Sequence, residues 1–572
     1  MKAKHLVWLR RISQALFLVL FLFLLVETRF PDSIYLEYSL AVTTEQDIRL
    51  HYPSTFFFQL NPLIWLTSLL SGHIWIKGFF WAVGVILLTL LLGRFFCGFV
   101  CPLGTLHHMA GRIRPALKGK KMIEANRKRG SQKIKYFLLL TLLISSLMGL
   151  NFTGLLDPIS LFFRSLALAV FPALGNGIKA ICDVIARSDI KPLNLLSYGA
   201  EVLVSPVFGY GYQSFKTGWF IGVLFLVILF LNRIRPRFWC RTLCPLGALL
   251  AIFSRFSILG LEKNNETCTD CKLCERDCQG AASLHPDQGW DHTECLLCFN
   301  CSGGCPENAL SFRFKWSHLP SRGPDMGRRA VLGGLMAGIS LPLLGRLDGN
   351  IHAVSDPRLI RPPGALEEKN FLELCQRCGL CMKVCPTNVI NPALTEGGMA
   401  AFWTPNLIMT LGYCEYSCIL CGSVCPTGAI KEISSKEKIE QPVRIGSAYI
   451  VRGRCLPWSG NGPCIVCEEH CPTSPKAIYL RNEVVPRSDG KESEVLLPYV
   501  DLKRCVGCGI CEYKCPVKGR PAVLVIAAGE SRSVRNQILL DMQGGSYAQG
   551  GLASPRRERV EQGKPFHRLD RR

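Results

Sequence analysis

The sequence lacks the short motifs of several common redox and catalytic sites. It contains no C-x-x-C-H run, which excludes the usual covalent attachment of a haem. It contains no G-x-G-x-x-G run after a predicted strand, which excludes the common dinucleotide-binding turn. We also find no convincing pair of side chains for general acid–base catalysis. The chemistry of this chain must therefore come from other residues.

Acidic residues are scarce relative to basic ones. Against 66 Lys and Arg stand 43 Asp and Glu, which gives a formal net charge of +23. The basic residues lie beside apolar segments and in the C-terminal tail and form no recognisable nucleic-acid reader motif, so we expect no nucleic-acid partner. The mean hydropathy of +0.22 is high for a soluble protein, and the excess lies in the first 235 residues.

Four apolar segments predict transmembrane helices, because most extend with their neighbours toward the ~20 residues that span a bilayer. A buried helix of a soluble protein is the alternative for the shorter ones. The segments are residues 12–26, 74–92, 136–156 and 219–231. Lys and Arg, including Arg94, Lys135 and Arg237, gather before the first segment and after the second and fourth, which places the N-terminus and these loops in the cytoplasm. Residues 1–255 are thus predicted to be a four-helix domain in the lipid of a bacterial inner membrane.

Most of the 29 cysteines form six groups of four with C-x2-C-x2-C-x3-C spacing or a close variant, which is typical of ligands to 4Fe-4S clusters. Zinc sites seldom use this triple spacing, and a disulfide framework is typical of small secreted domains. The groups are Cys268, Cys271, Cys274 and Cys278; Cys295, Cys298, Cys301 and Cys305; Cys375, Cys378, Cys381 and Cys385; Cys414, Cys418, Cys421 and Cys425; Cys455, Cys464, Cys467 and Cys471; and Cys505, Cys508, Cys511 and Cys515. Six clusters in one chain predict electron transfer.

The fourth cysteine of each run reaches the neighbouring cluster in two-cluster ferredoxins. We therefore expect Cys305 to join the first three cysteines of the first group, and Cys278 to join those of the second. Gln279 replaces the usual proline after Cys278, which weakens the turn but removes no thiolate. The spacing does not indicate which of the last four groups exchange. Cys455 is the least secure ligand, because "LPWSGNGP" separates it from Cys464.

The groups define two α+β ferredoxin-like domains, at residues 256–318 and 351–529. Between them, residues 322–350 carry the pair Arg328-Arg329 before a Gly-rich apolar run, which resembles an internal twin-arginine export signal and would act as a fifth, anchor-like segment. The alternative is a linker helix between two cytoplasmic domains. An export signal places the first domain in the cytoplasm and the second in the periplasm. Residues 530–572 are polar, Gly-rich and basic, and are expected to be disordered.

Two similar boxes, "RFFCGFVCPLG" and "RFWCRTLCPLG", end the second and fourth apolar segments. If the two halves pack together, Cys97, Cys101, Cys240 and Cys244 meet near the cytoplasmic face. Three interpretations are open: one shared metal centre or cluster, a redox-active thiol pair, or a structural helix stop.

His107 and His108 follow the first box; they would either accept quinol protons or be interfacial histidines without such a role, and the second interpretation is favoured. Cys182 is interpreted as a small buried residue.

With these motifs the N-terminal part resembles the NapH-, MauN- and NosR-type membrane polyferredoxins, and the twin-arginine segment with four groups resembles the NapG- and MauM-type exported ferredoxins. The resemblance implies a fusion of two subunits that are usually separate, and an oxidoreductase component whose terminal chemistry lies on a partner. It implies the quinone pool as electron donor and a periplasmic reductase of the nitrate-reductase type, or a cytochrome c, as acceptor. NosR-type proteins also carry an outer flavin domain, which the outer loops here are too small to hold.

Two other functions remain open at this stage. A cytoplasmic donor would feed the first ferredoxin domain and make quinol unnecessary. Alternatively, the chain would be an assembly factor that keeps the metal centre of a partner enzyme reduced during maturation, as the resemblance to CcoG-type polyferredoxins implies.

Overall fold

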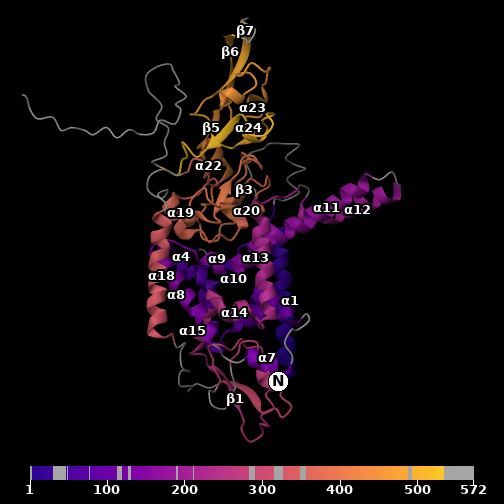
Figure 1. Cartoon of the computed structure of the whole chain (residues 1–572), viewed down its shortest axis with the longest axis vertical. Coiled ribbons are helices and arrows are strands. Elements are labelled where there is room, and N and C mark those ends of the chain that lie inside the picture. The colour runs from indigo at the N-terminus through magenta and orange to yellow at the C-terminus, as the bar shows by residue number, and fades with distance from the viewer. Residues whose placement is uncertain are drawn as a thin grey trace, which may run out of the picture. The chain divides into compact units, whose positions relative to one another are not determined.

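Apolar helices dominate the first half of the chain, as its hydropathy predicts (Figure 1). The computed structural model describes residues 3–29, 47, 49–76, 78–112, 119–126, 130–187, 191–209, 212–282, 290–314, 326–347, 356–486 and 492–533. All of these belong to one unit, residues 1–537. Most of the tail that was predicted to be disordered, from residue 534 onward, lies outside the described residues, as do parts of the basic loops and of the twin-arginine segment.

The helices before the first ferredoxin domain differ widely in length. They are α1 (Ala3–Glu27), α3 (Phe56–Gln59), α4 (Pro62–Gly72), α5 (Phe79–Leu92), η1 (Phe96–Val100), α6 (Pro102–Arg112), α7 (Gly119–Asn126), η2 (Gly130–Lys133), α8 (Ile134–Leu147), α9 (Thr153–Leu156), α10 (Pro158–Ser165), η3 (Leu166–Val170), α11 (Phe171–Ala186), α12 (Lys191–Phe208), α13 (Gly218–Phe230), η4 (Leu231–Arg233), α14 (Phe238–Thr242) and α15 (Pro245–Ser254). Buried Phe, Leu and Ile side chains fill the space between them.

Two helices in the described part are long and apolar enough to cross a membrane: Lys4–Glu27 and Pro158–Ala186. The first contains the first predicted span. The second lies between the third and fourth predicted spans, where the sequence analysis placed an outer segment. The second and fourth predicted spans form shorter apolar helices, α5 and α13, and the third breaks at the end of α8. The structure thus shows a helical domain without establishing four spans.

The helix α18 (Arg328–Leu347) contains the twin-arginine pair and packs along α8. Gly334 lies beside Leu140, Gly338 beside Ile144, and Gly345 beside Leu150, so the two helices run in the same direction. The spacing of Gly334 and Gly338 is the small-residue pattern that lets membrane helices approach closely. With 20 residues, α18 is about 30 Å long.

Small two-stranded antiparallel sheets characterise the two cysteine-rich regions. The first region has β1 (Leu259–Lys263) paired with β2 (Leu310–Phe314), and the helices α16 (Leu273–Arg276) and α17 (Asn300–Gly303). The second has the sheets β3 (Ile390–Pro392) with β4 (Pro405–Leu407), β5 (Ser447–Ile450) with β8 (Val523–Ile526), and β6 (Ile478–Pro486) with β7 (Glu492–Val500). Its helices are α19 (Glu368–Leu374), α20 (Leu380–Val384), η5 (Met399–Ala401), α21 (Leu420–Ser423), α22 (Ser435–Glu440), η6 (Arg452–Arg454), α23 (Val466–Glu469) and α24 (Ile510–Tyr513). The β3, β6 and β8 strands each follow a Cys-Pro pair in the chain.

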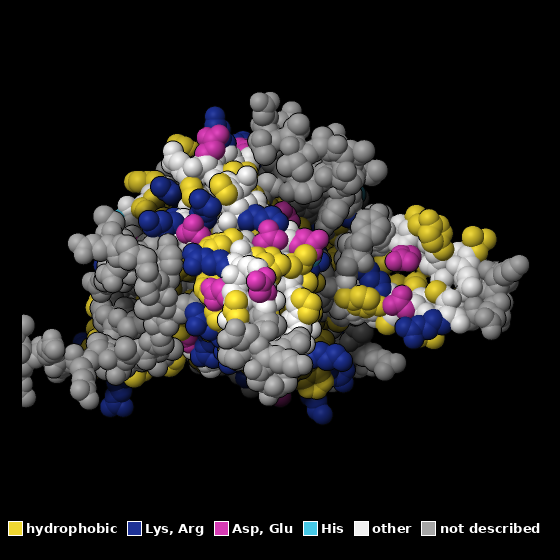
Figure 2. Space-filling model, turned by 90° about the horizontal axis from the view of Figure 1, so that it is seen from above, with side chains coloured by type: hydrophobic (Ala, Val, Ile, Leu, Met, Phe, Trp, Pro, Cys, Tyr) yellow, Lys and Arg dark blue, Asp and Glu magenta, His cyan; other side chains and the backbone are white. Residues whose placement is uncertain are grey.

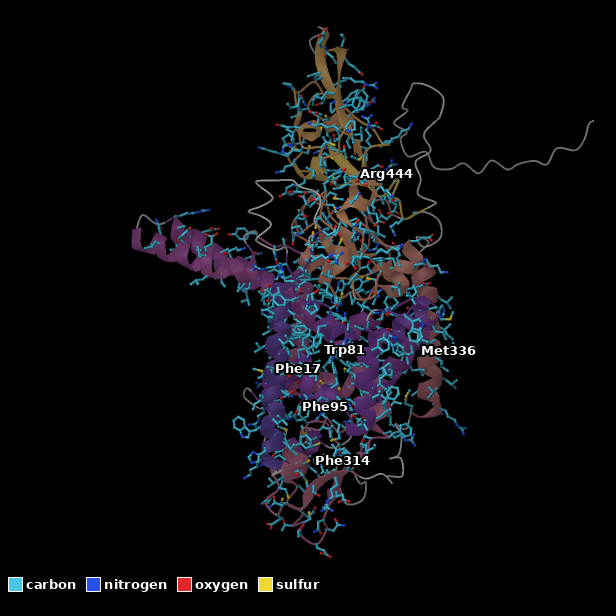
Figure 3. The ribbon with its side chains drawn as sticks, turned by 180° about the vertical axis from the view of Figure 1, so that it is seen from behind. Phe17, Trp81, Phe95, Phe314, Met336 and Arg444 are labelled. Carbon is cyan, nitrogen blue, oxygen red and sulfur yellow. The ribbon has the colours of Figure 1, made fainter. Side chains whose placement is uncertain are left out.

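The two cysteine-rich regions contact opposite ends of α8. At its start, Lys135 bonds to Glu294 of the first region; just after its end, the carbonyl of Asn151 accepts a hydrogen bond from Arg377 of the second. Figure 3 shows the same order, with Phe314 and Arg444 on either side of the helices that hold Phe17, Trp81 and Met336.

Candidate iron–sulfur sites

The first cysteine-rich region gathers its eight thiols into the two crossed sets that the sequence predicts. Thiol group I consists of Cys268, Cys271, Cys274 and Cys305, which line one small cavity. Thiol group II consists of Cys295, Cys298, Cys301 and Cys278, whose thiols are close enough to interact electrostatically.

The second region also crosses its fourth cysteines, which the sequence alone did not assign. The thiols of each set interact electrostatically or line one cavity. Thiol group III is Cys375, Cys378, Cys381 and Cys425; group IV is Cys414, Cys418, Cys421 and Cys385; group V is Cys455, Cys464, Cys467 and Cys515; and group VI is Cys505, Cys508, Cys511 and Cys471. Cys455 therefore lies with the other thiols of its group despite the insertion that follows it.

The chemistry of these groups fits iron–sulfur clusters. All 29 cysteines are free, which argues against a disulfide framework. Within the described ranges, no set of three His, Cys, Asp or Glu side chains is placed to hold a single metal ion. The four thiols of group I line one small cavity, and those of group VI line another, as the ligands of a larger cluster do. Backbone N–H groups donate to several sulfurs, for example Ala448 to Cys505 at 3.4 Å and Ala522 to Cys515 at 3.3 Å.

Burial makes a bare thiolate costly at these positions. It raises the pKa of Cys467 to about 12, with the neighbouring Cys455 and Cys464 adding to the shift, and it raises the pKa of Cys508 to about 12 as well. A bound cluster would hold these sulfurs in the ionised form, so cluster binding and folding should be coupled.

Lys438 of α22 is a buried cation at thiol group IV. Its Nζ donates to the carbonyls of Glu415 and Cys418, both at 2.7 Å, and lies 3.6 Å from the sulfur of Cys414. A fixed positive charge here stabilises the reduced state of a bound cluster, which carries the more negative charge. Nearby charges and hydrogen bonds to sulfur set the reduction potentials of such clusters. Lys438 was not among the predicted site residues, since a basic residue in a polar stretch carries no motif.

The four thiol groups of the second region lie next to one another in a row. Cys381 of group III interacts with Cys421 of group IV, and Cys511 of group VI interacts with Cys467 of group V. The backbone N–H of Cys414 donates to the carbonyl of Cys508 at 2.8 Å, which joins groups IV and VI. The order is therefore III, IV, VI, V.

Groups II and III each approach the helical domain closely at a glycine. A Cβ on Gly98 of the first box would stand 2.2 Å from the carbonyl oxygen of Leu296, between Cys295 and Cys298. A Cβ on Gly154 would stand 1.6 Å from the carbonyl oxygen of Gln376, between Cys375 and Cys378. Both positions require glycine, because only glycine lets the backbones approach this closely.

The two C-x3-C-P-L-G boxes meet, as the repeat suggests. Cys244 interacts electrostatically with Cys97, Cys101 and Cys240. Arg237 reaches across to donate to the carbonyl of Cys97 at 3.2 Å and lies beside Gly104; in the reciprocal contact, Arg94 lies beside Gly247.

The second cysteine of each box starts a new helix. Cys101 and Cys244 have extended backbone, and their sulfurs accept from the N–H groups of Gly104 at 3.4 Å and Gly247 at 3.2 Å. In neither box do the two cysteines lie on one continuous α-helix.

Several basic residues that were expected to mark the cytoplasmic loops are buried. Arg94 and Lys135 are 1% and 0% exposed and contact the carboxylate of Glu294, with the shorter distance, 2.5 Å, to Lys135. Tyr136 donates to the same carboxylate at 3.1 Å. Arg237 is likewise buried. These residues are therefore weaker evidence for membrane orientation than was expected from the sequence, because their charges make contacts inside the protein. Cys182 is buried, as expected.

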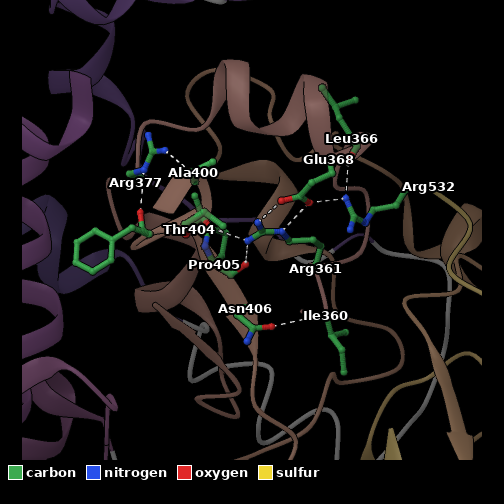
Figure 4. Close-up of polar contacts among 12 residues, drawn as sticks. Ile360, Arg361, Leu366, Glu368, Arg377, Ala400, Thr404, Pro405, Asn406 and Arg532 are labelled. Carbon is green, nitrogen blue, oxygen red and sulfur yellow. Dashed lines mark hydrogen bonds and ion pairs between the residues drawn. The ribbon is translucent and has the colours of Figure 1, made fainter. Parts of the chain in front are cut away.

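A second buried ion pair closes the second region (Figure 4). Arg361 and Arg532 both bond to Glu368, and Arg361 also donates to the carbonyl of Pro405 at 2.6 Å. Arg532 follows β8, so the pair ties the end of this region to its beginning.

Comparison with known proteins supports the iron–sulfur assignment. Two family models described as 4Fe-4S binding domain match the chain, one at residues 64–121, 216–260 and 420–444 and the other at residues 371–391. The ferredoxin-type protein NapG of Escherichia coli is 36% identical over 214 residues, covering 36% of this chain and 87% of NapG.

Two methylamine utilisation ferredoxin-type proteins are also similar. MauM of Paracoccus denitrificans is 34% identical over 204 residues, covering 35% of this chain and 83% of MauM. MauM of Methylorubrum extorquens is 33% identical over 175 residues, covering 30% of this chain and 74% of that protein. No solved structure matches the chain.

Proposed function

Since this chain belongs to the family of the ferredoxin-type proteins NapG and MauM, and is an iron–sulfur electron-transfer protein, we propose that it conducts electrons across a bacterial inner membrane. In this proposal the 24 cysteines of groups I to VI hold six 4Fe-4S clusters, which supply one-electron transfer when bound. Quinol is the donor, and a periplasmic reductase or cytochrome c is the acceptor. A NapH-type membrane part in the same chain is compatible with the helical domain.

The directions in which the helices run between the two cysteine-rich regions support this proposal. From the end at groups I and II, α1, α8 and α18 run toward group III, while α5 and α13 run back. For α1, Lys4 lies near Cys278 and Arg29 near Lys383. For α5, Gly93 at its end lies beside Leu297. These are the directions expected of four spans followed by an export helix, with the first region in the cytoplasm and the second in the periplasm.

For α13 the contacts bracket the helix. Lys216, before its start, donates its backbone N–H to Asn391, and Asn232, after its end, bonds to His107. The helix therefore joins the group III end to the cysteine boxes. Because α18 is about 30 Å long and parallel to α8, it is long enough to carry the chain across the hydrocarbon layer.

Group V is the proposed exit of electrons, because it ends the sequence of thiol groups that starts at group III. Beside it, Arg452 lies 4.1 Å from the ring centroid of Trp458, and Trp458 contacts Tyr499 edge to face. Aromatic and arginine side chains are favoured at protein interfaces. The end of the molecule that Figure 2 shows carries basic, acidic and apolar side chains together.

Cys97, Cys101, Cys240 and Cys244 remain a proposed shared cluster beside group II, since no three of the described side chains there are placed to hold a single metal ion. Substitution of Cys97 and Cys240 tests it through the iron content. Fewer iron atoms per chain would support the cluster, and unchanged iron with retained activity would exclude it.

The topology test uses alkaline phosphatase fused after Ile360, with fusion after Phe314 as the matched control. The proposal expects an active reporter at Ile360 and an inactive one at Phe314. An inactive reporter at Ile360 would place both regions in the cytoplasm and end the conduit proposal. Mixing the purified protein with a menaquinol analogue tests the donor: bleaching of cluster absorption supports quinol, and no bleaching supports a cytoplasmic donor.

A further inference from the structure

A cavity of about 530 Å³ lies where α1, α6, α7 and thiol group II come together. Its lining includes Trp8, His107, Arg237, Cys278 and Gly111. The volume falls in the range of small-molecule sites, ~300–1,000 Å³. The cavity touches group II through Cys278 and the first cysteine box through the helix that follows it.

Three buried side chains in this lining have polar atoms without a partner among the described residues: Oε1 of Gln279 and nitrogens of His107 and Arg237. Among the described residues, neither Nε2 of His107 nor Nε and Nη2 of Arg237 has a hydrogen-bond partner. His107 is 0% exposed and Arg237 is 1% exposed. Buried polar atoms are nearly always satisfied in folded proteins, so unpartnered atoms beside a cavity point to a ligand that satisfies them.

The hydrogen bonds of Asn232 assign the ring proton of His107. The amide nitrogen of Asn232 donates to the carbonyl of Leu229 at 2.9 Å and lies 2.7 Å from Nδ1 of His107. Nδ1 is therefore the acceptor, and the proton of the neutral ring is on Nε2. Burial lowers the pKa of His107 to about 4, which keeps the ring neutral near pH 7. His107 and Arg237 thus both offer N–H donors and require an acceptor oxygen.

The position of the cavity indicates a ligand from the membrane. Trp8 and Arg11 lie at the start of α1, where aromatic and basic residues mark a membrane interface. Farther along α1, Leu9, Ile12, Leu16 and Val19 are exposed on one face. A head group held by His107 and Arg237 would leave room for an apolar tail along this face.

We propose that this cavity binds the ring of a prenylated quinone, with a ring oxygen accepting hydrogen bonds from His107 and Arg237. This inference rests on the proposed function, which makes the quinone pool the electron donor. It assigns His107 a binding role that the sequence analysis disfavoured. It also separates this site from the larger apolar cavity of about 750 Å³ between α8, α9, α18 and residues 394–402, whose lining is almost wholly apolar.

The test is photolabelling of the purified, cluster-loaded protein with an azide-bearing prenylated benzoquinone, followed by peptide mapping. Label on peptides with Trp8 or His107 is expected. His107→Phe, which removes the donor and keeps a ring, should weaken labelling about tenfold, the cost of one lost hydrogen bond to a buried group. Iron content and gel-filtration behaviour show that the variant is folded.

A second test compares a variant that fills the cavity with a matched control variant elsewhere in the protein. Gly111 lines the cavity and a Cβ there meets no atom within 4 Å, so Gly111→Leu should fill the space and abolish labelling. Gly177 of α11 also has open space and lies away from the cavity, so Gly177→Leu should label like the parent protein. Equal labelling of the two variants would overturn the placement.

The remaining outcomes separate this inference from the proposed function. Label confined to residues 138–156 or 394–402 would move the quinone to the apolar cavity and overturn the placement alone. Loss of labelling when phosphatidylglycerol is added in place of a neutral lipid would identify the cavity as a phospholipid site and overturn it as well. No label anywhere together with no bleaching by quinol would overturn both.

Discussion

Glu294 accepts a hydrogen bond from the fully buried Lys135, one residue before Cys295 begins thiol group II. Arg94 shares the same carboxylate. Removing the carboxylate leaves two buried cations without compensation, which typically costs about 3–5 kcal/mol. We expect Glu294→Ala to lower the unfolding temperature and to release iron from the first region.

The matched control is Glu266→Ala, because Glu266 is exposed in the same region. Thermal unfolding in detergent and iron per chain are the measurements. Equal stability of the two variants would show that the contact of Arg94 and Lys135 with Glu294 does not hold this region to the helices.

Gly338 fixes the contact between α18 and α8. A Cβ there would stand 2.6 Å from the Cβ of Ile144 and 2.9 Å from the carbonyl oxygen of Thr141, so Gly338→Leu should force the helices apart. We expect a loss of about 1–3 kcal/mol and less full-length protein in the membrane fraction. Gly84→Leu in α5, with open space at its Cβ, is the control; a similar yield for both would contradict close packing.

Lys438 should raise the reduction potential of the cluster at thiol group IV. Lys438→Met removes a positive charge beside Cys414 and should lower that potential by on the order of 50 mV. The control is Lys436→Met, since Lys436 is exposed on the same helix. Potentiometric titration followed by electron paramagnetic resonance measures the shift; the same potential in both variants would exclude an influence of Lys438.

The stability of the second region should depend on pH through Glu368. Burial alone would raise the pKa of Glu368, but Arg361 and Arg532 lower it overall below the ordinary value of 4.5. Their stabilisation is therefore fully present above about pH 4.5 and is lost as the pH falls through the lowered pKa.

Glu368→Gln should be less stable than the parent at about pH 7, and the difference should shrink toward about pH 4. Urea unfolding followed by tryptophan fluorescence measures it, with Glu367→Gln at the exposed neighbouring position as control. A difference that is constant with pH would mean that the charge of Glu368 is not the cause.

The sequence predicts the local chemistry well because ligand spacing is local. The sharing of Cys278 and Cys305 follows from a known arrangement of adjacent runs. The exchange between groups III and IV depends on pairing across many residues: Ala365 bridges Ile430, and Leu366 donates to the carbonyl of Ala429. Those contacts bring Cys425 back to Cys375, and no spacing rule contains them.

The helical domain was predicted less completely. The apolar helix from Pro158 to Ala186 was missed because Arg164, Pro172 and two glycines interrupt its hydropathy. In the structure Arg164 is buried and donates to the carbonyl of Arg377 at 2.8 Å, so its charge is used at the contact with group III. A charge inside an apolar segment signalled a contact between domains rather than the end of a helix.

The crossing of the fourth cysteines also governs biosynthesis. Group III stays incomplete until Cys425 has been translated, and group V must wait for Cys515, near the end of the described chain. A ribosome that stalls after Cys511 would leave group V open although its first three cysteines were made long before. Insertion of the cluster at group V must therefore follow synthesis of nearly the whole second region, whereas groups III and IV have all their thiols once Cys425 is made. A transporter that accepts only folded cargo would reject every shorter intermediate.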